Sequence, residues 1–490
     1  MTGLSFVATR YRARARADSR ACVPNAHSTN LVVSFASELL NKAGALINTG
    51  LHPSEIVAGY KKAAGLLQST LEQVVLDSIG NVRDQAVLAH AIKSVVASKF
   101  YGYEDLLAAL VAEACVYAMS VEGTGKASLS VDNVRVVKLP GGSIHASSVV
   151  RGMVLLRPPM GTVTRRVKAG VAVFGTNIEA AQTETKGTVL LQSAEELLKY
   201  SGTEEDMLEE QIRGIRDSGV DVVVSGGSVS EMALHFFEKY GMMVVKVASK
   251  FELQRICRAT RAFPVIRLGS FTLLACGSNR ALRAGPVMEE EKGHCEIVEV
   301  REIGGEQCVV FEQVGDDSKV ATIVLRSSTS NQLDDLERAM DDSINAVKTL
   351  CGDARLVGGA GACEIELALR MAAVAEKSTG LEQYPMTKFA EALEVVPRTL
   401  AENAGLDPNE VVSRLYAAHK GGNARAGVDV EHEATATAGV LADVQAAGIM
   451  DALASKLQAL RLAADVAITV LSIDQLIMSK QSGGPQLPKQ

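Results

Sequence analysis

The hydrophobic pattern of this chain changes twice along its length. Apolar residues recur at helical spacing through the first hundred-odd residues, as in LVVSFASELLNKAGALINTG over residues 31–50. From about residue 130, short valine-rich segments such as DVVVSGG alternate with helical ones. Helical spacing returns past residue 332. We therefore expect helical, then α/β, then helical structure, and the pattern alone leaves open whether the two helical ends form one domain.

Bulk composition excludes several classes of protein. With 490 residues the chain has room for about three domains, and 47% hydrophobic and 22% charged residues are ordinary for a globular protein. A net charge of −7 gives no sign of a nucleic-acid partner, and no apolar run reaches the length of a membrane span. The eight cysteines form no CxxC pair and the eight histidines no HExxH motif, which argues against a zinc site and fits a reducing compartment.

A glycine-rich turn stands before one of the later helices, in CGDARLVGGAGACEIELA (351–368). Backbone N–H groups freed by glycine at a helix N-terminus can close on a phosphate. A tight turn for close packing is the alternative, and the residues alone leave both open. Glu364 occupies the position at which a dinucleotide fingerprint has its third glycine.

Four blocks in the second half of the chain resemble the group II chaperonins in content and order. The blocks are LERAMDDSINAVKTL (336–350), LVGGAGACEIELALRM (356–371), KFAEALEVVPRTLAENAGLDPNEVVSRLYAAH (388–419) and AAGIMDALASKLQALRLAADVAITVLSIDQLIM (446–478). The resemblance runs from about residue 28 to the end. It implies a multidomain α plus α/β chaperonin fold with a split helical equatorial domain, a split intermediate hinge domain, and an α/β apical domain with a helical lid protrusion.

The resemblance also implies where these domains lie. The expected division is a leader at 1–27, equatorial parts at 28–92 and 369–480, intermediate parts at 93–165 and 328–368, an apical client-binding domain at 166–327, and a flexible tail at 481–490. The lid protrusion corresponds to residues 193–208.

The function implied by the resemblance is that of an ATP-dependent folding subunit. Such a subunit uses ATP and Mg²⁺, sits in the cytoplasm in a hetero-oligomeric double ring of eight-membered rings, and binds unfolded or nascent client proteins. Neither nucleic acid nor membrane is an expected partner. An unrelated α/β nucleotide enzyme is disfavoured, because the chain offers no complete cofactor fingerprint and no nucleophile–base set.

Site residues carry over by position. Asp342 matches the acid that positions the attacking water, a role that suits a helix-borne carboxylate. The expected nucleotide-binding residues are Thr29, Asn30, Gly359, Ala360, Gly361, Gly427, Asp451 and Lys456. The expected client-binding residues are Phe251, Leu253, Arg255, Ile256 and Arg258. Ala360 replaces a family glycine, which we expect to be tolerable only if its φ is negative.

Two regions depart from the family pattern. Residues 26–30 read AHSTN, where the family has GDGTT or GDGTN. His27 therefore takes the place of the Mg²⁺-binding aspartate. An imidazole is a poor ligand for a hard cation. The family's upstream phosphate loop has no counterpart, and residues 270–285 form an insertion. We interpret the leader and the insertion as gene-model artefacts; a transit peptide and a genuine loop are the alternatives.

Two expectations follow from these departures. Helix 31–48 should turn its apolar face to elements that this chain does not contain, and the isolated chain should then fold poorly. The subunit could also be a non-hydrolysing one, which binds clients or fills a ring position only.

Overall fold

The computed structural model describes residues 29–121, 127–178, 194–265, 290–313, 315, 319–430, 439–475 and 477; at 121, 194–204 and 207 it describes the backbone alone. The predicted leader 1–27, the insertion 270–285 and the tail 481–490 lie outside these ranges. The chain divides into two compact units. Unit 1 combines residues 1–82 with 352–490, and unit 2 comprises residues 83–351. The finer three-domain division stays a prediction.

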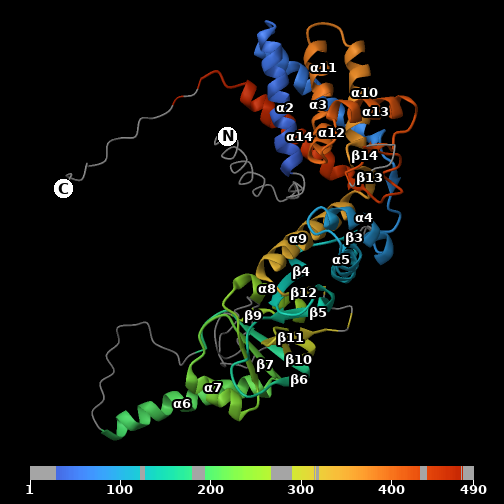
Figure 1. Cartoon of the computed structure of the whole chain (residues 1–490). Helices are drawn as coiled ribbons and strands as arrows, with labels where there is room; N and C mark the ends of the chain where they lie inside the picture. The colour runs from blue at the N-terminus through green and yellow to red at the C-terminus, as the bar shows by residue number, and fades with distance from the viewer. Residues whose placement is uncertain are drawn as a thin grey trace, which may run out of the picture. The chain divides into compact units, whose positions relative to one another are not determined.

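Unit 1 is a helical assembly built from both ends of the chain (Figure 1). Its helices are α2 (Thr29–Asn48), α3 (Pro53–Glu72), α10 (Ala362–Lys377), α11 (Gln383–Ala392), α12 (Val395–Asn403), α13 (Pro408–Lys420) and α14 (Leu453–Leu471). An aromatic cluster lies in its core, where the Phe389 ring centroid is 5.4 Å from that of Phe35 and 5.8 Å from that of Tyr60. The Tyr60 hydroxyl donates to the Leu39 carbonyl at 2.9 Å, which satisfies its buried polar end.

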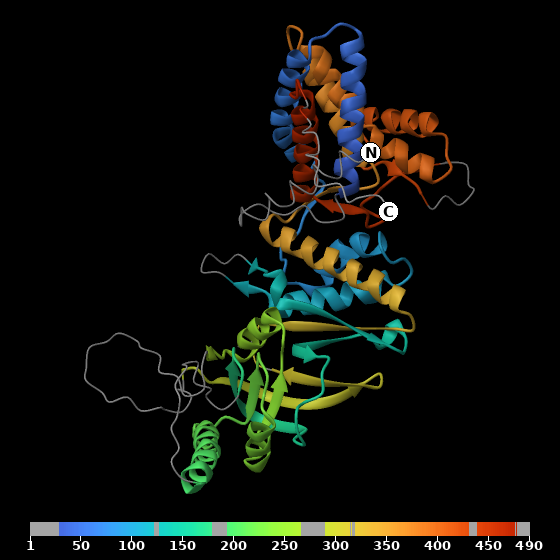
Figure 2. The same ribbon diagram turned by 90° about the vertical axis from the view of Figure 1, so that its left-hand side faces the viewer.

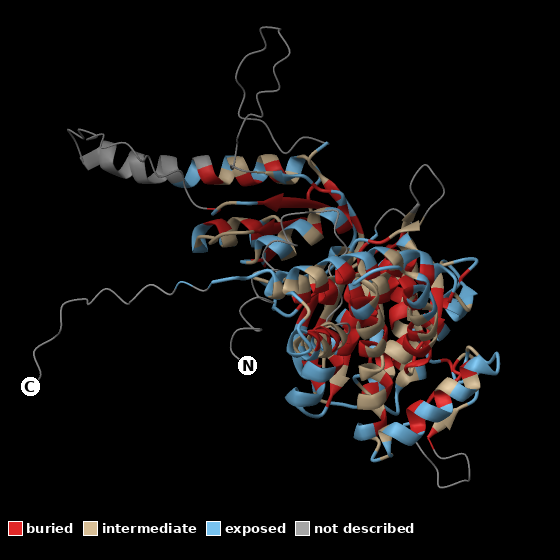
Figure 3. Cartoon of the chain, turned by 90° about the horizontal axis from the view of Figure 1, so that it is seen from above, coloured by how far each residue is buried: buried red, intermediate tan, exposed pale blue. Residues whose placement is uncertain are grey.

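The apolar face of α2 is covered by helices of this same chain. Phe35, Leu39 and Leu46 are buried, and the helix packs against α14, α11 and α3. The buried faces of the unit 1 helices point inward in Figure 3. The expectation that helix 31–48 faces missing elements is therefore wrong for Phe35, Leu39 and Leu46, because α14 and α11 cover these residues. Val33 and Ile47 of the same helix are exposed.

Local sequence signals account for the turn between α2 and α3. Gly50 has a φ of +97°, the left-handed conformation that commonly ends a helix. Pro53 opens α3 at a position where its missing N–H costs nothing, and His52 caps the helix by accepting the Ser54 N–H.

Distant segments of unit 1 meet in small sheets. The three-stranded sheet has the order β1 (Asp77–Ser78), β13 (Arg355–Gly358) and β16 (Met450–Ala452), all antiparallel. A second antiparallel pair is β14 (Gly427–Val428) with β15 (Val440–Leu441). Strand β13 runs directly into the glycine-rich turn, so these sheets fix the segments around it.

Unit 2 contains a nine-stranded mixed sheet (Figure 2). Its strands are β4 (Val134–Pro140), β5 (Ser148–Leu155), β6 (Arg165–Phe174), β7 (Val222–Ser225), β8 (Met243–Lys246), β9 (Pro264–Val265), β10 (Gly293–Ile303), β11 (Glu306–Glu312) and β12 (Ala321–Ser327). The order is β4-β12-β5-β11-β10-β6-β7-β8, with β9 beside β6. A separate hairpin pairs β2 (Ser120–Val121) with β3 (Ala127–Ser128), and short 3₁₀ turns lie at Val131–Asn133 and Ile144–Ala146.

The helices of unit 2 are α4 (Gln85–Ala97), α5 (Glu104–Ala118), α6 (Ala194–Asp217), α7 (Glu231–Lys239), α8 (Lys250–Thr260) and α9 (Ser330–Gly352). Strands β6, β7 and β8 are parallel, and α6 and α7 lie between them in sequence, as the α/β pattern predicted. Val222 and Val224 pack into one apolar cluster and Val223 into another, so β7 is buried on both faces. Of the helices described in either unit, none is long and apolar enough to cross a membrane.

Candidate functional site

The glycine-rich turn joins β13 to α10 in a left-handed conformation. Ala360 has a φ of +51° and Gly361 a φ of +79°. The expectation of a negative φ at Ala360 is therefore wrong. Because a left-handed conformation costs an L-residue about 1 kcal/mol, the turn holds Ala360 under strain that its neighbours must offset.

Backbone hydrogen bonds tie this turn to two other segments. The Gly359 N–H donates to the Ile449 carbonyl at 3.0 Å, and the Val428 N–H donates to the Ala360 carbonyl at 2.8 Å. A Cβ on Gly359 would lie 2.9 Å from Ile449 Cγ2, and one on Gly427 would lie 2.6 Å from Val444 Cγ1. Close packing alone thus accounts for glycine at these positions, and it brings Gly359, Ala360, Gly361 and Gly427 together.

A buried ionic triad lies at the start of α10. Lys456 Nζ is 2.6 Å from Asp451 Oδ2 and 2.8 Å from Glu364 Oε1. Glu364 is fully buried and the Lys456 side chain is 8% exposed, whereas that of Asp451 is 30% exposed. Burial lowers the pKa of Lys456, but attraction to Asp451 and Glu364 outweighs it and raises that pKa well above its usual value. Lys456 is thus held by protein carboxylates.

Sequence reasoning missed Glu364 as a member of this triad. Its signal was an acidic residue inside the apolar run at the first turn of a helix, where the helix dipole favours negative charge. Its Oε2 atom is buried with no hydrogen-bond partner in the part of the chain that the structure describes.

A second buried contact links α10 to α13 and to the segment before β14. His419 Nδ1 lies 2.9 Å from Glu366 Oε2, and its Nε2 lies 2.9 Å from the Ala426 carbonyl oxygen. Arg370 also donates to Glu366, at 2.8 Å. Burial would raise the pKa of Glu366, but the hydrogen bonds from His419 and Arg370 lower it below its usual value. This contact holds Ala426 next to Gly427.

Thr29 and Asn30 begin helix α2, where Thr29 is half-buried and Asn30 is exposed. His27 lies outside the described residues. Within the described ranges, no group of three or more His, Cys, Asp or Glu side chains is arranged to hold a metal ion.

Asp342 belongs to unit 2, on helix α9. It is buried, and Lys99 Nζ lies 3.8 Å from its Oδ2 atom. Its neighbour Asp341 has a raised pKa, because of burial first and then of repulsion from Glu337 and Asp342. Lys99 follows α4 directly and was not identified from the sequence, since nothing in its local pattern connects it with a residue more than 200 positions away.

The five expected client-binding residues lie on helix α8, some at the surface and some in the core. Phe251 is 75% exposed and Ile256 is fully buried, with Leu253 packed at the edge of the core. Arg255 donates to the Asp132 carbonyl at 3.0 Å, and Arg258 donates to Asn133 Oδ1 at 3.2 Å. The side chain of Ile256 therefore anchors the helix instead of forming part of its outer surface.

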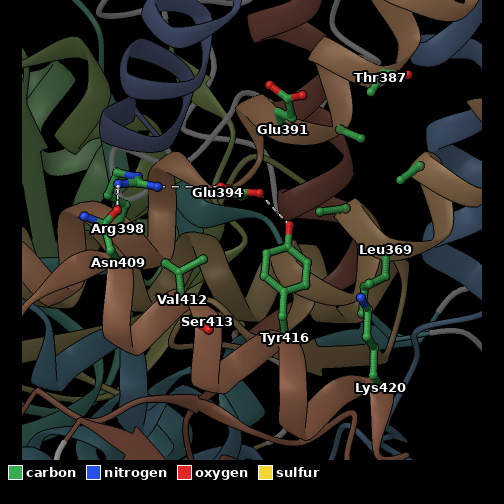
Figure 4. Close-up of a pocket in the computed structure, with 13 residues that line it drawn as sticks. Leu369, Thr387, Glu391, Glu394, Arg398, Asn409, Val412, Ser413, Tyr416 and Lys420 are labelled. Atoms are coloured by element: carbon green, nitrogen blue, oxygen red, sulfur yellow. Dashed lines mark hydrogen bonds and ion pairs between the residues drawn. The ribbon is translucent and has the colours of Figure 1, made fainter.

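A cavity of about 530 Å³ opens between α10, α11, α12 and α13 (Figure 4). Much of its polar wall is internally paired: the Tyr416 hydroxyl donates to Glu394 Oε1 at 2.7 Å, and Arg398 donates to Asn409 Oδ1 at 2.9 Å. The residues that line it include none of the expected nucleotide-binding residues. The turn at 358–361 contributes no residue to the wall of this cavity.

A model of the TCP-1/cpn60 chaperonin family matches residues 27–481. The chain belongs to this family.

Three relatives of this chaperonin chain are named as theta subunits of T-complex protein 1. One from Dictyostelium discoideum is 42% identical over 461 residues, which cover 94% of this chain and 81% of the relative. A probable theta subunit from Schizosaccharomyces pombe is 45% identical over 462 residues, covering 94% and 80%. The human theta subunit is 43% identical over 460 residues, which cover 94% of this chain and 80% of the human protein.

A solved structure gives the same family. The open-state monomer of a group II chaperonin from Methanococcoides burtonii aligns with a TM-score of 0.66 and 27% identity, over 91% of this chain and 99% of that one. The predicted chaperonin fold is thereby confirmed, as is the resemblance to the theta subunit of the eukaryotic cytosolic chaperonin. This chaperonin chain is a subunit that assists protein folding.

Proposed function

We propose that this chaperonin chain binds an adenine nucleotide in unit 1, beside the turn at 358–361. The observation that carries the proposal is the convergence of three segments, in which the turn is hydrogen-bonded to Ile449 and to Val428. Asp451 lies on one of these segments with a partly exposed carboxylate. A carboxylate is a natural acceptor for ribose hydroxyl groups, and the start of α10 presents the positive end of a helix dipole.

The described residues suit the nucleoside part of a bound ATP better than its triphosphate and Mg²⁺. Asp451 and the turn suit the nucleoside and a neighbouring phosphate. Within the described ranges, no group of three or more His, Cys, Asp or Glu side chains is arranged to hold Mg²⁺. Bound ATP supplies a phosphoanhydride bond whose hydrolysis drives the chaperonin cycle in this family.

Titration of the full chain with ATP tests nucleotide binding. We expect Asp451→Asn to weaken ATP binding about tenfold, because it removes a charged hydrogen-bond acceptor. Gly65→Ala, on the exposed surface of α3, is the matched control and should leave the affinity unchanged. A wild-type chain that does not bind ATP would refute the proposal.

We propose Asp342 as the carboxylate that orients the attacking water when ATP is hydrolysed. Its burial and its contact with Lys99 keep the carboxylate in one place, as this role requires. Asp342→Asn should reduce single-turnover ATP hydrolysis at least about 100-fold and leave ATP binding intact. Equal hydrolysis by wild type and Asp342→Asn would refute this role.

A second candidate is a subunit that binds nucleotide or clients without turnover. The observation that favours it is in the sequence, where His27 takes the place of the family's Mg²⁺-binding aspartate, and an imidazole is a poor ligand for a hard cation. If the wild-type chain binds ATP but hydrolyses it no faster than Asp342→Asn, the second candidate is the better one.

We further propose that the chain works in the cytoplasm, in a double ring of eight-membered rings, and captures unfolded clients through α8. The exposed Phe251 beside Arg255 and Arg258 supports the client surface. Phe251→Ala should reduce capture of a chemically unfolded protein, while Val167→Ala, at another exposed apolar position, should not. Electron microscopy of the endogenous complex would test the ring.

A further inference from the structure

We infer that Glu364 is a positioning residue for ligand hydroxyl groups, acting through Lys456 on Asp451. This inference rests on the proposed nucleotide site and adds a residue to it. It starts from an unusual feature: a fully buried carboxylate with one oxygen against an ammonium group and the other without a hydrogen-bond partner among the described residues. Moving a charged group from water into a protein core costs free energy, so a buried ionic group that is kept needs a reason.

The triad has an order from core to surface. Glu364 is 0% exposed, Lys456 is 8% exposed, and Asp451 is 30% exposed. Glu364 lies in the first turn of α10, where the helix dipole stabilises its charge. Lys456 lies in the first turns of α14, and Asp451 lies on β16. The buried end is therefore anchored in two helices, and Asp451 is the member of the triad with the most exposed side chain.

Charge sharing explains why a second carboxylate is needed. With Asp451 alone, the Lys456 ammonium would neutralise the one carboxylate that faces outward. Glu364 takes part of that attraction from 2.8 Å, so the Lys456 ammonium is shared between two carboxylates. Asp451 remains an anionic acceptor while Lys456 fixes the position of its Oδ2 atom.

The Asp451 carboxylate indicates which class of ligand the site would bind. An anionic carboxylate held in one orientation selects hydroxyl donors, and a nucleotide presents them on its ribose. Glu364 should therefore set how strongly the site prefers a ribonucleotide over one that lacks ribose hydroxyls. A merely structural role would instead weaken both nucleotides alike.

The test compares dissociation constants of ATP and 2′,3′-dideoxy-ATP for the full chain by calorimetry. We expect the wild type to prefer ATP about tenfold, the value of one hydrogen bond to a charged group. Glu364→Gln should remove most of that preference by weakening ATP, with the dideoxy affinity unchanged. Glu376→Gln removes an exposed carboxylate from the same helix and should keep the preference.

A double-variant cycle shows whether Glu364 acts through Asp451. In an Asp451→Asn background, Glu364→Gln should change the preference no further. If Glu364→Gln unfolds the chain, Glu364→Asp withdraws the carboxylate by one methylene and should give an intermediate preference. A wild-type preference in whichever of these two variants folds, or an equal effect in both backgrounds, would overturn the inference.

Binding by the wild-type chain separates a failure of the nucleotide site from a failure of the Glu364 role. A wild-type chain that binds neither nucleotide refutes the proposed function, and this inference with it. A wild-type chain that prefers ATP, with a Glu364→Gln variant that prefers it equally, refutes only the role of Glu364.

Discussion

Ala360 carries a backbone conformation that suits glycine better than alanine. Its φ of +51° costs about 1 kcal/mol for an L-residue, and glycine would remove that cost while adding some unfolded-state entropy. We expect Ala360→Gly to raise the free energy of unfolding by about 0.5 kcal/mol in urea titration. Ala373→Gly, at an exposed position inside α10, should lower the free energy of unfolding by about 1 kcal/mol. A destabilised Ala360→Gly variant would contradict the strain argument.

Glu366 should make the stability of unit 1 sensitive to acid. Its pKa in the folded chain lies below the usual 4.5, so its contribution is fully present above that pH and is lost as pH falls through the folded value. Glu366→Gln should cost about 1 kcal/mol at pH 7, measured by urea unfolding. The difference between variant and wild type should then shrink below about pH 4.5. A difference that stays constant down to pH 3 would contradict this assignment.

Residue types could be predicted at the candidate site, but their partners could not. The blocks around Asp342, Gly359 and Asp451 were recognisable from the sequence. What Lys456 contacts was not, because Glu364 lies about 90 positions away and reaches it only in the folded chain. The φ of Ala360 was also hidden, since neighbouring hydrogen bonds impose it.

At the scale of elements, the crossing of α3 and α11 depends on one glycine. A Cβ on Gly59 would lie 2.6 Å from Pro385 Cβ and 3.3 Å from the Glu382 carbonyl oxygen. Gly59→Ala should therefore lower the free energy of unfolding by about 1–3 kcal/mol, as overpacking does. In the same helix no atom of the described residues lies within 4 Å of the Cβ position of Gly65, so Gly65→Ala should raise the free energy of unfolding by about 0.5–1 kcal/mol. Opposite signs in thermal unfolding would support this packing, and equal signs would contradict it.

Elements with strong local signals were predictable, and those made by distant segments were not. Helix α3 begins at Pro53, and the parallel strands β7 and β8 follow their valine runs. The sheet of β1, β13 and β16 has strands of two to four residues drawn from positions 77 to 452. Such short strands carry no periodicity, so only their pairing reveals them.

At the scale of the whole molecule, the two units have separate cores. The cluster around Phe35 and Phe389 draws only on unit 1, and that around Val222 and Ile256 only on unit 2. We expect Gly59→Ala to speed amide hydrogen exchange in peptides of unit 1 and leave peptides of unit 2 near wild type. Exchange followed by mass spectrometry measures both at once. Equal acceleration in both units would show that they unfold as one.

Because unit 1 is built from both ends of the chain, its helices are synthesised at widely separated times. Helix α2 leaves the ribosome early, yet α14, against which it packs, follows about 400 residues later. At about 5–20 residues per second, its apolar face waits roughly 20–80 seconds for that partner. Unit 2 is contiguous and can fold during this interval. A nascent chain of this folding subunit therefore exposes apolar surface of α2 until α14 has emerged.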